Sequence, residues 1–249
     1  MNDLLVSIIV PMYNASATIK DTIESVLAQT YKNWEMIILD DCSLDSSATI
    51  VEAYCKKDLR IKYVLSEINQ GVCASRNKAL KLASGELIAF LDSDDTWAAD
   101  KLEKQCQFMR NNDIAFSYTA CDVIDEKGVP TGQIRNVPKE IDYKGLLKGN
   151  CIPCLTVMID RKKVNFDGMP SVHHEDYAAW LSVLKTGIKA YGMNEVLAHY
   201  RVCNSSLSGN KFKAMKWTWD IYRKQENLGI IKSSYYFCNY VIKALLKRV

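Results

Sequence analysis

The sequence lacks any apolar run near the roughly 20 residues that a helix needs to span a bilayer. Its longest apolar stretch, Cys151 to Ile159, is interrupted by Pro153. The N-terminal Met-Asn-Asp has none of the basic character of a secretory leader. These absences favour a cytoplasmic protein over a secreted or membrane-spanning one.

Phosphate-cradling glycine motifs are also absent. The eleven glycines form neither G-x-G-x-x-G after a strand nor the P-loop G-x-x-x-x-G-K-[ST]. Any bound phosphates must therefore be neutralised by a metal ion or by basic side chains.

The nine cysteines do not predict a disulfide scaffold or a zinc site. They are odd in number and scattered through a chain of 249 residues, and Cys151-Ile-Pro-Cys154 is the single C-x-x-C pair. Reduced, mostly buried thiols in a reducing compartment are the expected state.

Hydrophobic residues make up 48% of the chain and charged residues 24%, as in an ordinary globular protein. Up to residue 109, apolar runs alternate with segments of helical spacing, which predicts a parallel sheet covered by helices on both faces. In this first part we expect strands at 5–10, 34–39, 61–65 and 87–91, and helices starting near Ser16 or Thr18, Ser46 or Ser47, Val72 and Asp100. Beyond it the pattern loosens, and we expect strands at 114–121, 155–159 and 196–202, a turn at 126–130 and a helix at 175–186.

Carboxylates gather where the expected strands end. Asp40 and Asp41 follow the second strand, and Asp92, Asp94 and Asp95 follow the fourth. Open α/β sheets bind ligands at this edge, and like charges there are costly unless they share a cation. The pattern indicates a divalent metal bound together with a phosphate-bearing substrate. A single acid can instead be a helix cap or a loop residue, the role we assign to Asp45 and Asp100.

Four segments in this order resemble the family 2 glycosyltransferases of the GT-A fold: residues 6–14 (VSIIVPMYN), 38–45 (ILDDCSLD), 69–77 (NQGVCASRN) and 89–95 (AFLDSDD). The resemblance is strong over about Leu5 to Met109 and looser through His174 to Ser208. It implies a Rossmann-like, mostly parallel sheet with flanking helices. It also implies inverting transfer of a sugar from a UDP-sugar to a hydroxyl, with Mn²⁺ or Mg²⁺.

The resemblance also implies a role for individual residues. Asp41 matches the carboxylate that accepts from the uracil N3–H, and Asp92-x-Asp94 matches the D-x-D signature, with Asp95 as an alternative metal ligand. Tyr13 is equally well explained as a half-buried aromatic at a strand end, and a surface helix arginine is the alternative interpretation of Arg76. The residues expected to bind the nucleotide are Pro11, Tyr13, Asn14, Asp41, Arg76, Asp92 and Ser93.

An inverting transfer needs a base for the acceptor hydroxyl, which typically contributes on the order of 10²–10⁴-fold in rate. The resemblance assigns this role to Asp176, with Glu175 as second choice; two acids stabilising a helix N-terminus are the alternative. The segment 199–208 resembles a late loop of the family that closes over the donor. This resemblance implies diphosphate contacts by Arg201, Ser208 and Lys211. Many relatives carry a histidine where this chain has Cys203 or Asn204, which weakens any assignment of a histidine ligand there.

Charge divides the chain near residue 208. Residues 209–249 carry nine basic and two acidic side chains, so their net charge is +7. Because the whole chain has a net charge of +3, the first 208 residues carry −4. We expect a catalytic domain at 1–208, with its nucleotide-binding half at about 1–110 and its acceptor half at about 111–208, and a basic, aromatic, helical tail at 209–249. The tail predicts peripheral attachment to the anionic inner face of the cytoplasmic membrane. The alternatives are aromatic packing onto the catalytic domain or a homodimer interface.

The expected acceptor, by family analogy, is a glycan or a lipid-diphosphate-linked sugar in surface polysaccharide synthesis. A metal-dependent nucleotidyltransferase is one alternative, although residues 11–15 (PMYNA) are not its basic glycine-rich loop. A non-catalytic carbohydrate-binding or scaffold protein is another, although the key acids are all present. No nucleic-acid-reading module accompanies the basic tail, so we expect no nucleic acid partner.

Overall fold

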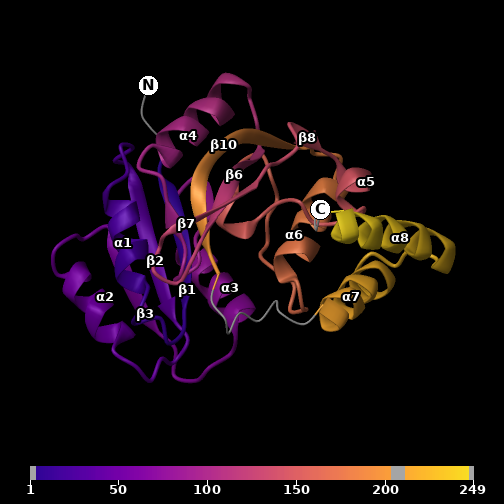
Figure 1. Cartoon of the computed structure of the whole chain (residues 1–249). Helices are drawn as coiled ribbons and strands as arrows, with labels where there is room; N and C mark the ends of the chain where they lie inside the picture. Colours follow the sequence, from indigo (N-terminus) through magenta and orange to yellow (C-terminus); the bar gives the residue numbers. More distant parts are fainter. Residues whose placement is uncertain (1–3, 203–210, 247–249) are drawn as a thin grey trace.

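The computed structural model describes residues 4–202 and 211–246, with the side chains of 4–202 and 213–245. Its centre is one ten-stranded sheet with helices on both faces (Figure 1). Along the main path of this sheet the strands follow the order β3-β2-β1-β4-β9-β6-β10-β5.

The first half of the sheet is parallel throughout, with β1 pairing β2 and β4, and β2 pairing β3. Every residue of β1 and β2 is buried, as expected of strands covered on both faces. The elements of this half are β1 (Val6–Met12), α1 (Ile19–Leu27), β2 (Trp34–Asp40), α2 (Ser47–Cys55), β3 (Ile61–Leu65), α3 (Val72–Leu82), β4 (Leu87–Phe90), β5 (Thr96–Trp97) and α4 (Lys101–Asn111).

The second half mixes directions. Strand β9 is antiparallel to both β4 and β6, so β6 runs with β4, and β10 is parallel to β6. The six strands β3, β2, β1, β4, β6 and β10 therefore share one direction, which confirms the mostly parallel α/β fold. The elements here are β6 (Phe116–Ile124), β7 (Pro130–Arg135), β8 (Glu140–Ile141), α5 (Tyr143–Leu146), the 3₁₀ turn η1 (Cys154–Thr156), β9 (Met158–Asp160), α6 (Glu175–Lys185) and β10 (Ala190–Arg201).

The expected strand at 155–159 is wrong in its first part. Residues 154–156 form the 3₁₀ turn η1, because the Thr156 hydroxyl donates to the carbonyl of Pro153 at 2.8 Å and closes the turn. The strand then runs from Met158 to Asp160. The expected turn at 126–130 is present, with Gly128 at φ +82°, and it joins β6 to the unexpected strand β7.

Two buried clusters lie on opposite faces of the sheet. One packs α1, α2 and α4 onto the sheet through residues such as Ile23, Val51 and Leu102. The other packs α3 and α6 through Ala79 and Trp180. The sequence motifs follow the parallel strands at their carboxyl edge, between these two layers of helices.

The tail consists of α7 (Lys211–Asp220), a π-helical turn η3 (Ile221–Gln225) and α8 (Ile230–Leu246). It lies beside α5 and α6 in Figure 1. The Tyr222 hydroxyl is buried and donates to the Leu147 carbonyl at 2.6 Å, and Glu226 accepts from Tyr143 (2.6 Å) and Lys185 (2.9 Å). These contacts fix η3 and the residue after it to α5 and α6. No helix in the two described ranges is both long and apolar enough to cross a membrane.

Candidate active site

The carboxyl edge of the sheet brings the first two sequence motifs together. Pro11 is buried within β1, and the ring of Tyr13 is 47% exposed just beyond it. The Asn14 amide donates to the Ser43 hydroxyl at 2.9 Å, and the Asn14 side-chain oxygen accepts from the Leu44 amide at 2.8 Å. The turns after β1 and β2 therefore form one wall, with an open aromatic ring at its rim.

Asp40 and Asp41 are both buried, and they have different partners. Asp40 accepts from the Ser43 amide and the Tyr63 hydroxyl, both at 2.8 Å, so it braces its own turn. Asp41 accepts from the backbone amides of Gln70 (2.9 Å) and Gly71 (2.7 Å) and so positions the loop before α3. Each Asp41 oxygen keeps a second acceptor site, because a carboxylate oxygen accepts two hydrogen bonds.

Asp94 and Asp95 lie in the acidic turn after β4 but have different environments. Asp95 is 1% exposed; its Oδ1 accepts from the Arg201 amide at 2.8 Å, while its Oδ2 has no hydrogen-bond partner among the described residues. Asp94 is half-buried, and its burial and the neighbouring Asp92 charge raise its pKa to about 6. Burial and the charges of Asp94 and Asp92 also raise the pKa of Asp95 well above the usual range.

These carboxylates fit a hard divalent cation that is completed by substrate oxygens. Among the described residues, no three His, Cys, Asp or Glu side chains are grouped to hold a metal without other ligands. Mg²⁺ is typically held by one or two carboxylates plus substrate phosphates, which is the donor set that Asp92 and Asp94 offer. Burial and the Asp92 charge raise the pKa of Asp94 and so disfavour its ionised form, and a bound cation would offset this cost.

Arg76 links the acidic turn to α6. Its guanidinium is buried and lies 2.5 Å from an Asp92 oxygen through Nη2 and 2.5 Å from a Glu175 oxygen through Nη1. Charge-assisted bonds of this kind are short and strong. Arg76, expected to contact the nucleotide, thus ties the acidic turn to the start of α6.

Asp176 is a partly buried carboxylate with a raised pKa. It is half-buried in the first turn of α6, and its Oδ1 accepts from the Tyr177 amide at 2.7 Å, with the Asn150 amide 3.4 Å from Oδ2. Burial and the charge of Glu175 raise its pKa to about 6, against the opposing effect of Arg76. A carboxylate with a pKa near the working pH is suited to proton abstraction. Glu175 is held by Arg76, which makes Asp176 the better placed of the two.

Of the late-loop residues, only Arg201 has a described side chain. Its Nε donates to the Asp94 carbonyl at 2.7 Å, Nη1 to the Glu126 carbonyl at 3.0 Å and Nη2 to the Asp21 carboxylate at 3.0 Å. The Arg201 side chain is 3% exposed, and its hydrogen bond to the Asp94 carbonyl supports the acidic turn. Ser208, Cys203 and Asn204 lie outside the described residues, and Lys211 begins α7 with its side chain undescribed.

Sequence reasoning missed two other features near these motifs. His199 Nδ1 lies 2.6 Å from the Asp122 carboxylate, and His199 pairs across the sheet with Thr96, the residue after Asp95. His173 stacks on Trp217 of the tail, with ring centroids 4.2 Å apart. Neither pair had a signal in the sequence, because 77 and 44 residues separate their members.

Comparison with known proteins finds that the profile of "Glycosyl transferase family 2" matches residues 7–165. The chain is 48% identical to TuaG of Bacillus subtilis, named for teichuronic acid biosynthesis, over 98% of both chains. It is 43% identical to WfgD of Escherichia coli, a UDP-Glc:α-D-GlcNAc-diphosphoundecaprenol β-1,3-glucosyltransferase, over 99% of this chain and 96% of that one. Staphylococcus aureus TarS, solved with UDP-GlcNAc, has the same fold at a TM-score of 0.72 and 20% identity, over 96% of this chain and 72% of that one.

Proposed function

The chain belongs to glycosyl transferase family 2, and from this premise we propose that it transfers a sugar from a UDP-sugar to a hydroxyl of a lipid-diphosphate-linked acetamido sugar in surface polysaccharide synthesis. The observation that carries the proposal is the Arg76 bridge, because it joins the acidic turn to the helix that bears Asp176. The name of the E. coli relative supports both the donor and the acceptor.

Donor binding is assigned to the wall formed by the first two motifs. Asp41 offers its remaining acceptor sites to the uracil N3–H, and the exposed ring of Tyr13 offers a stacking face for the base. Pro11 and Asn14 shape this wall, and Ser93 lies in the acidic turn. The Ser93 carbonyl accepts from the hydroxyls of Thr18 (2.9 Å) and Thr22 (3.1 Å) of the α1 region, which holds the turn in place.

Asp94 and Asp92 are the residues that would hold Mn²⁺ or Mg²⁺. When bound, the cation stabilises the negative charge that develops on the departing UDP. Asp95 is buried and engaged with the Arg201 amide, so we assign it to the support of the turn. Arg201 supports the same turn through the Asp94 carbonyl, while diphosphate contacts by Ser208 and Lys211 stay predictions.

Asp176 is assigned as the base. Its carboxylate takes the proton of the acceptor hydroxyl as that oxygen attacks the anomeric carbon and the bond to UDP breaks. Glu175 and Arg76 orient the first turn of α6 and set the local charge. A binding module would need neither this base nor the acidic turn.

Peripheral membrane attachment through α8 completes the proposal. Its outward residues Ile231 (84% exposed), Tyr235 (56%), Ile242 (56%) and Leu245 (57%) recur at spacings of three, four or seven residues. Lys232 and Lys243 are exposed on the same helix. An apolar stripe with flanking lysines suits an anionic interface, and a bilayer-bound acceptor places the substrate there.

The transfer proposal is tested with purified protein, UDP-glucose or UDP-GlcNAc, and a synthetic lipid-diphosphate GlcNAc acceptor, with and without Mn²⁺. Metal-dependent release of UDP with formation of a lipid-linked disaccharide is expected. Acceptor-dependent turnover with CDP- or GDP-sugars but not with UDP-sugars would overturn the donor assignment.

Membrane attachment is tested by flotation with anionic and neutral vesicles. The Ile242→Glu, Leu245→Glu double variant should lose binding to anionic vesicles, whereas Leu59→Glu, at a 91% exposed leucine remote from the tail, should keep it. A wild-type protein that fails to float refutes the attachment. So does light scattering that shows a dimeric wild-type protein and a monomeric double variant, because these residues then form a dimer interface.

A further inference from the structure

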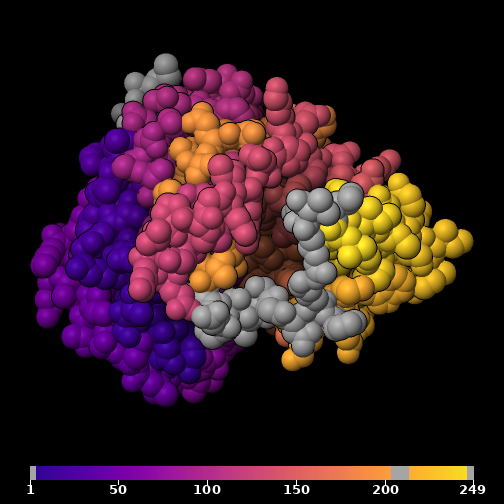
Figure 2. Space-filling model, viewed as in Figure 1, coloured from indigo at the N-terminus to yellow at the C-terminus, as the bar shows by residue number. Residues whose placement is uncertain are grey.

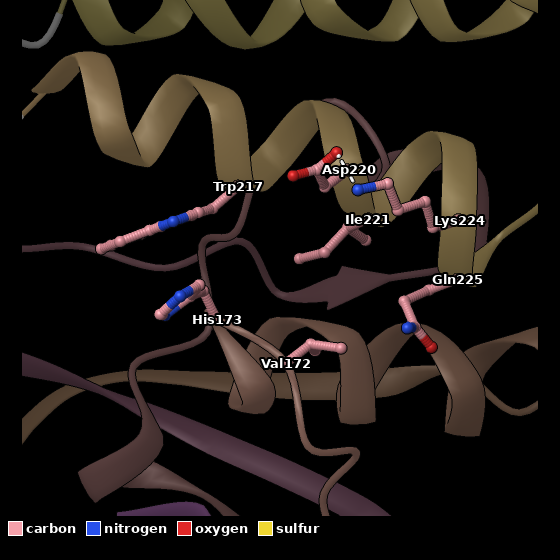
Figure 3. Close-up of a pocket in the computed structure, with 7 residues that line it drawn as sticks. All are labelled: Val172, His173, Trp217, Asp220, Ile221, Lys224 and Gln225. Carbon is pink, nitrogen blue, oxygen red and sulfur yellow. Dashed lines mark ion pairs between the residues drawn. The ribbon is translucent and has the colours of Figure 1, made fainter.

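A pocket of about 170 Å³ lies between the loop that enters α6 and the first two helical segments of the tail (Figure 3). Val172 and His173 of the loop form one side, and Trp217 and Ile221 of the tail lie opposite. The volume is well above the ~10–15 Å³ that admits one water and below the ~300 Å³ of pockets for drug-sized ligands. The pocket therefore has room for a group the size of one sugar ring.

The lining combines aromatic, apolar and polar groups. His173 stacks on the Trp217 indole with an interplanar angle of 19°, and His174 meets the same indole edge-on at 5.3 Å. At the other end, Asp220 and Lys224 form an ion pair of 2.9 Å (Figure 3). The exposed side chain of Gln225 adds an amide to the rim. Apolar walls with a few polar groups are typical of sites for small polar organic ligands.

His173, which lines the pocket, is close in the sequence to the assigned base. Only three peptide units separate His173 from Asp176, so their Cα atoms lie at most about 11 Å apart. This bound lets a sugar that is held at Asp176 by one hydroxyl extend toward the pocket. His174 reinforces this connection, because it contacts Trp217 and, with φ +57°, directly precedes α6.

We propose that this pocket is the acceptor subsite and takes the acetamido group of the acceptor sugar. The acetamido methyl packs against Trp217, Val172 and Ile221, and its amide meets the polar rim formed by Asp220 and Gln225. The proposal rests on the proposed function and deepens it, since it assigns acceptor selectivity to the start of the tail.

Steady-state kinetics on the full chain test this subsite. Trp217→Leu should raise the acceptor KM at least tenfold and the donor KM much less, and Gln225→Ala should raise the acceptor KM about threefold. Trp219→Leu is the matched control, because Trp219 packs on Phe237 of α8 and does not line the pocket. This control should leave the acceptor KM within twofold.

A double comparison tests the acetamido assignment itself. With wild type, a lipid-diphosphate glucose acceptor should have a KM at least tenfold above that of the GlcNAc acceptor, and Trp217→Leu should abolish most of this difference. Equal discrimination by both proteins, or an unchanged acceptor KM in Trp217→Leu, overturns the proposal.

A binding measurement separates this outcome from failure of the proposed function. Saturation-transfer NMR with methyl α-N-acetylglucosaminide needs no turnover, and its acetamido methyl signal should be present with wild type and Trp219→Leu and lost with Trp217→Leu. That result supports the pocket even in a preparation that transfers no sugar. A signal that persists in Trp217→Leu counts against the pocket whatever the activity.

Discussion

Replacement of Asp176 by asparagine should stabilise the fold at neutral pH while it removes the base. The pKa of Asp176 rises from 3.8 to about 6 in the folded chain. At 1.36 kcal/mol per unit, this shift corresponds to about 3 kcal/mol of cost for holding the ionised carboxylate. Partial exposure to solvent reduces the cost, so we expect Asp176→Asn to gain about 1–2 kcal/mol at pH 7.5.

The sign of the effect depends on pH. Between pH 3.8 and 6 the folded state binds this proton more tightly than the unfolded state, so the contribution of Asp176 to wild-type stability is complete below pH 3.8 and is lost as the pH rises through 6. The stability gain of Asp176→Asn should accordingly be present at pH 7.5 and absent near pH 4. Urea unfolding of both proteins at the two pH values measures it.

The same variant should lose on the order of 10²–10⁴-fold in transfer rate. Glu175→Gln is the contrasting neighbour: it removes an ion-pair partner of buried Arg76 and should cost about 1–3 kcal/mol in stability while it retains most of the transfer. An Asp176→Asn variant that is less stable than wild type at pH 7.5, or that still transfers sugar, refutes the assigned environment.

Three other predictions address the rest of the site. The transfer rate should rise with pH through an apparent pKa of about 6 as Asp176 ionises, and Glu175→Gln should move this limb to lower pH; a limb that does not move in rate profiles opposes the coupling of the two acids. Asp94→Ala should abolish transfer and Mn²⁺ binding, and EDTA should stop the wild-type enzyme until Mn²⁺ or Mg²⁺ is added; full activity in EDTA would exclude the metal role. Asp41→Ala should weaken UDP binding at least tenfold in titration calorimetry; equal wild-type affinities for UDP and CDP would contradict the uracil contact.

The alternation of strands and helices up to residue 109 could be predicted because β1, β2 and β4 are buried on both faces and read as largely apolar runs. Two other strands were harder to predict. Strand β7 is exposed along its whole length and has no apolar run, and strand β5 is two residues long and exists through its pairing with β10. Such strands depend on partners that are distant in the sequence, which local patterns do not show.

For the site, the sequence indicated which acidic residues gather at the carboxyl edge of the sheet, but not which of them is buried and hydrogen-bonded and which is accessible. Asp94 and Asp95 are neighbours of the same residue type, and only the Arg201 amide, 106 residues away, distinguishes the buried from the accessible carboxylate. Asp40 and Asp41 differ in the same way, through Tyr63 and the amides before α3. Residue type and spacing predict charge at an edge, whereas the assignment of each charge follows from long-range hydrogen bonds.

Arg76 shows why these long-range bonds matter for function. Its two carboxylate partners come from segments 16 and 99 residues away. A single buried guanidinium therefore holds the acidic turn close to the start of α6. A transfer reaction requires the leaving group and the base at a fixed separation, since misplacement by about 1 Å can cost 10²-fold in rate. The contacts of Trp217 with His173 and His174 extend the same constraint to the tail. The acidic turn, the start of α6 and the pocket-lining Trp217 are thereby linked by side-chain contacts, although they come from three distant parts of the chain.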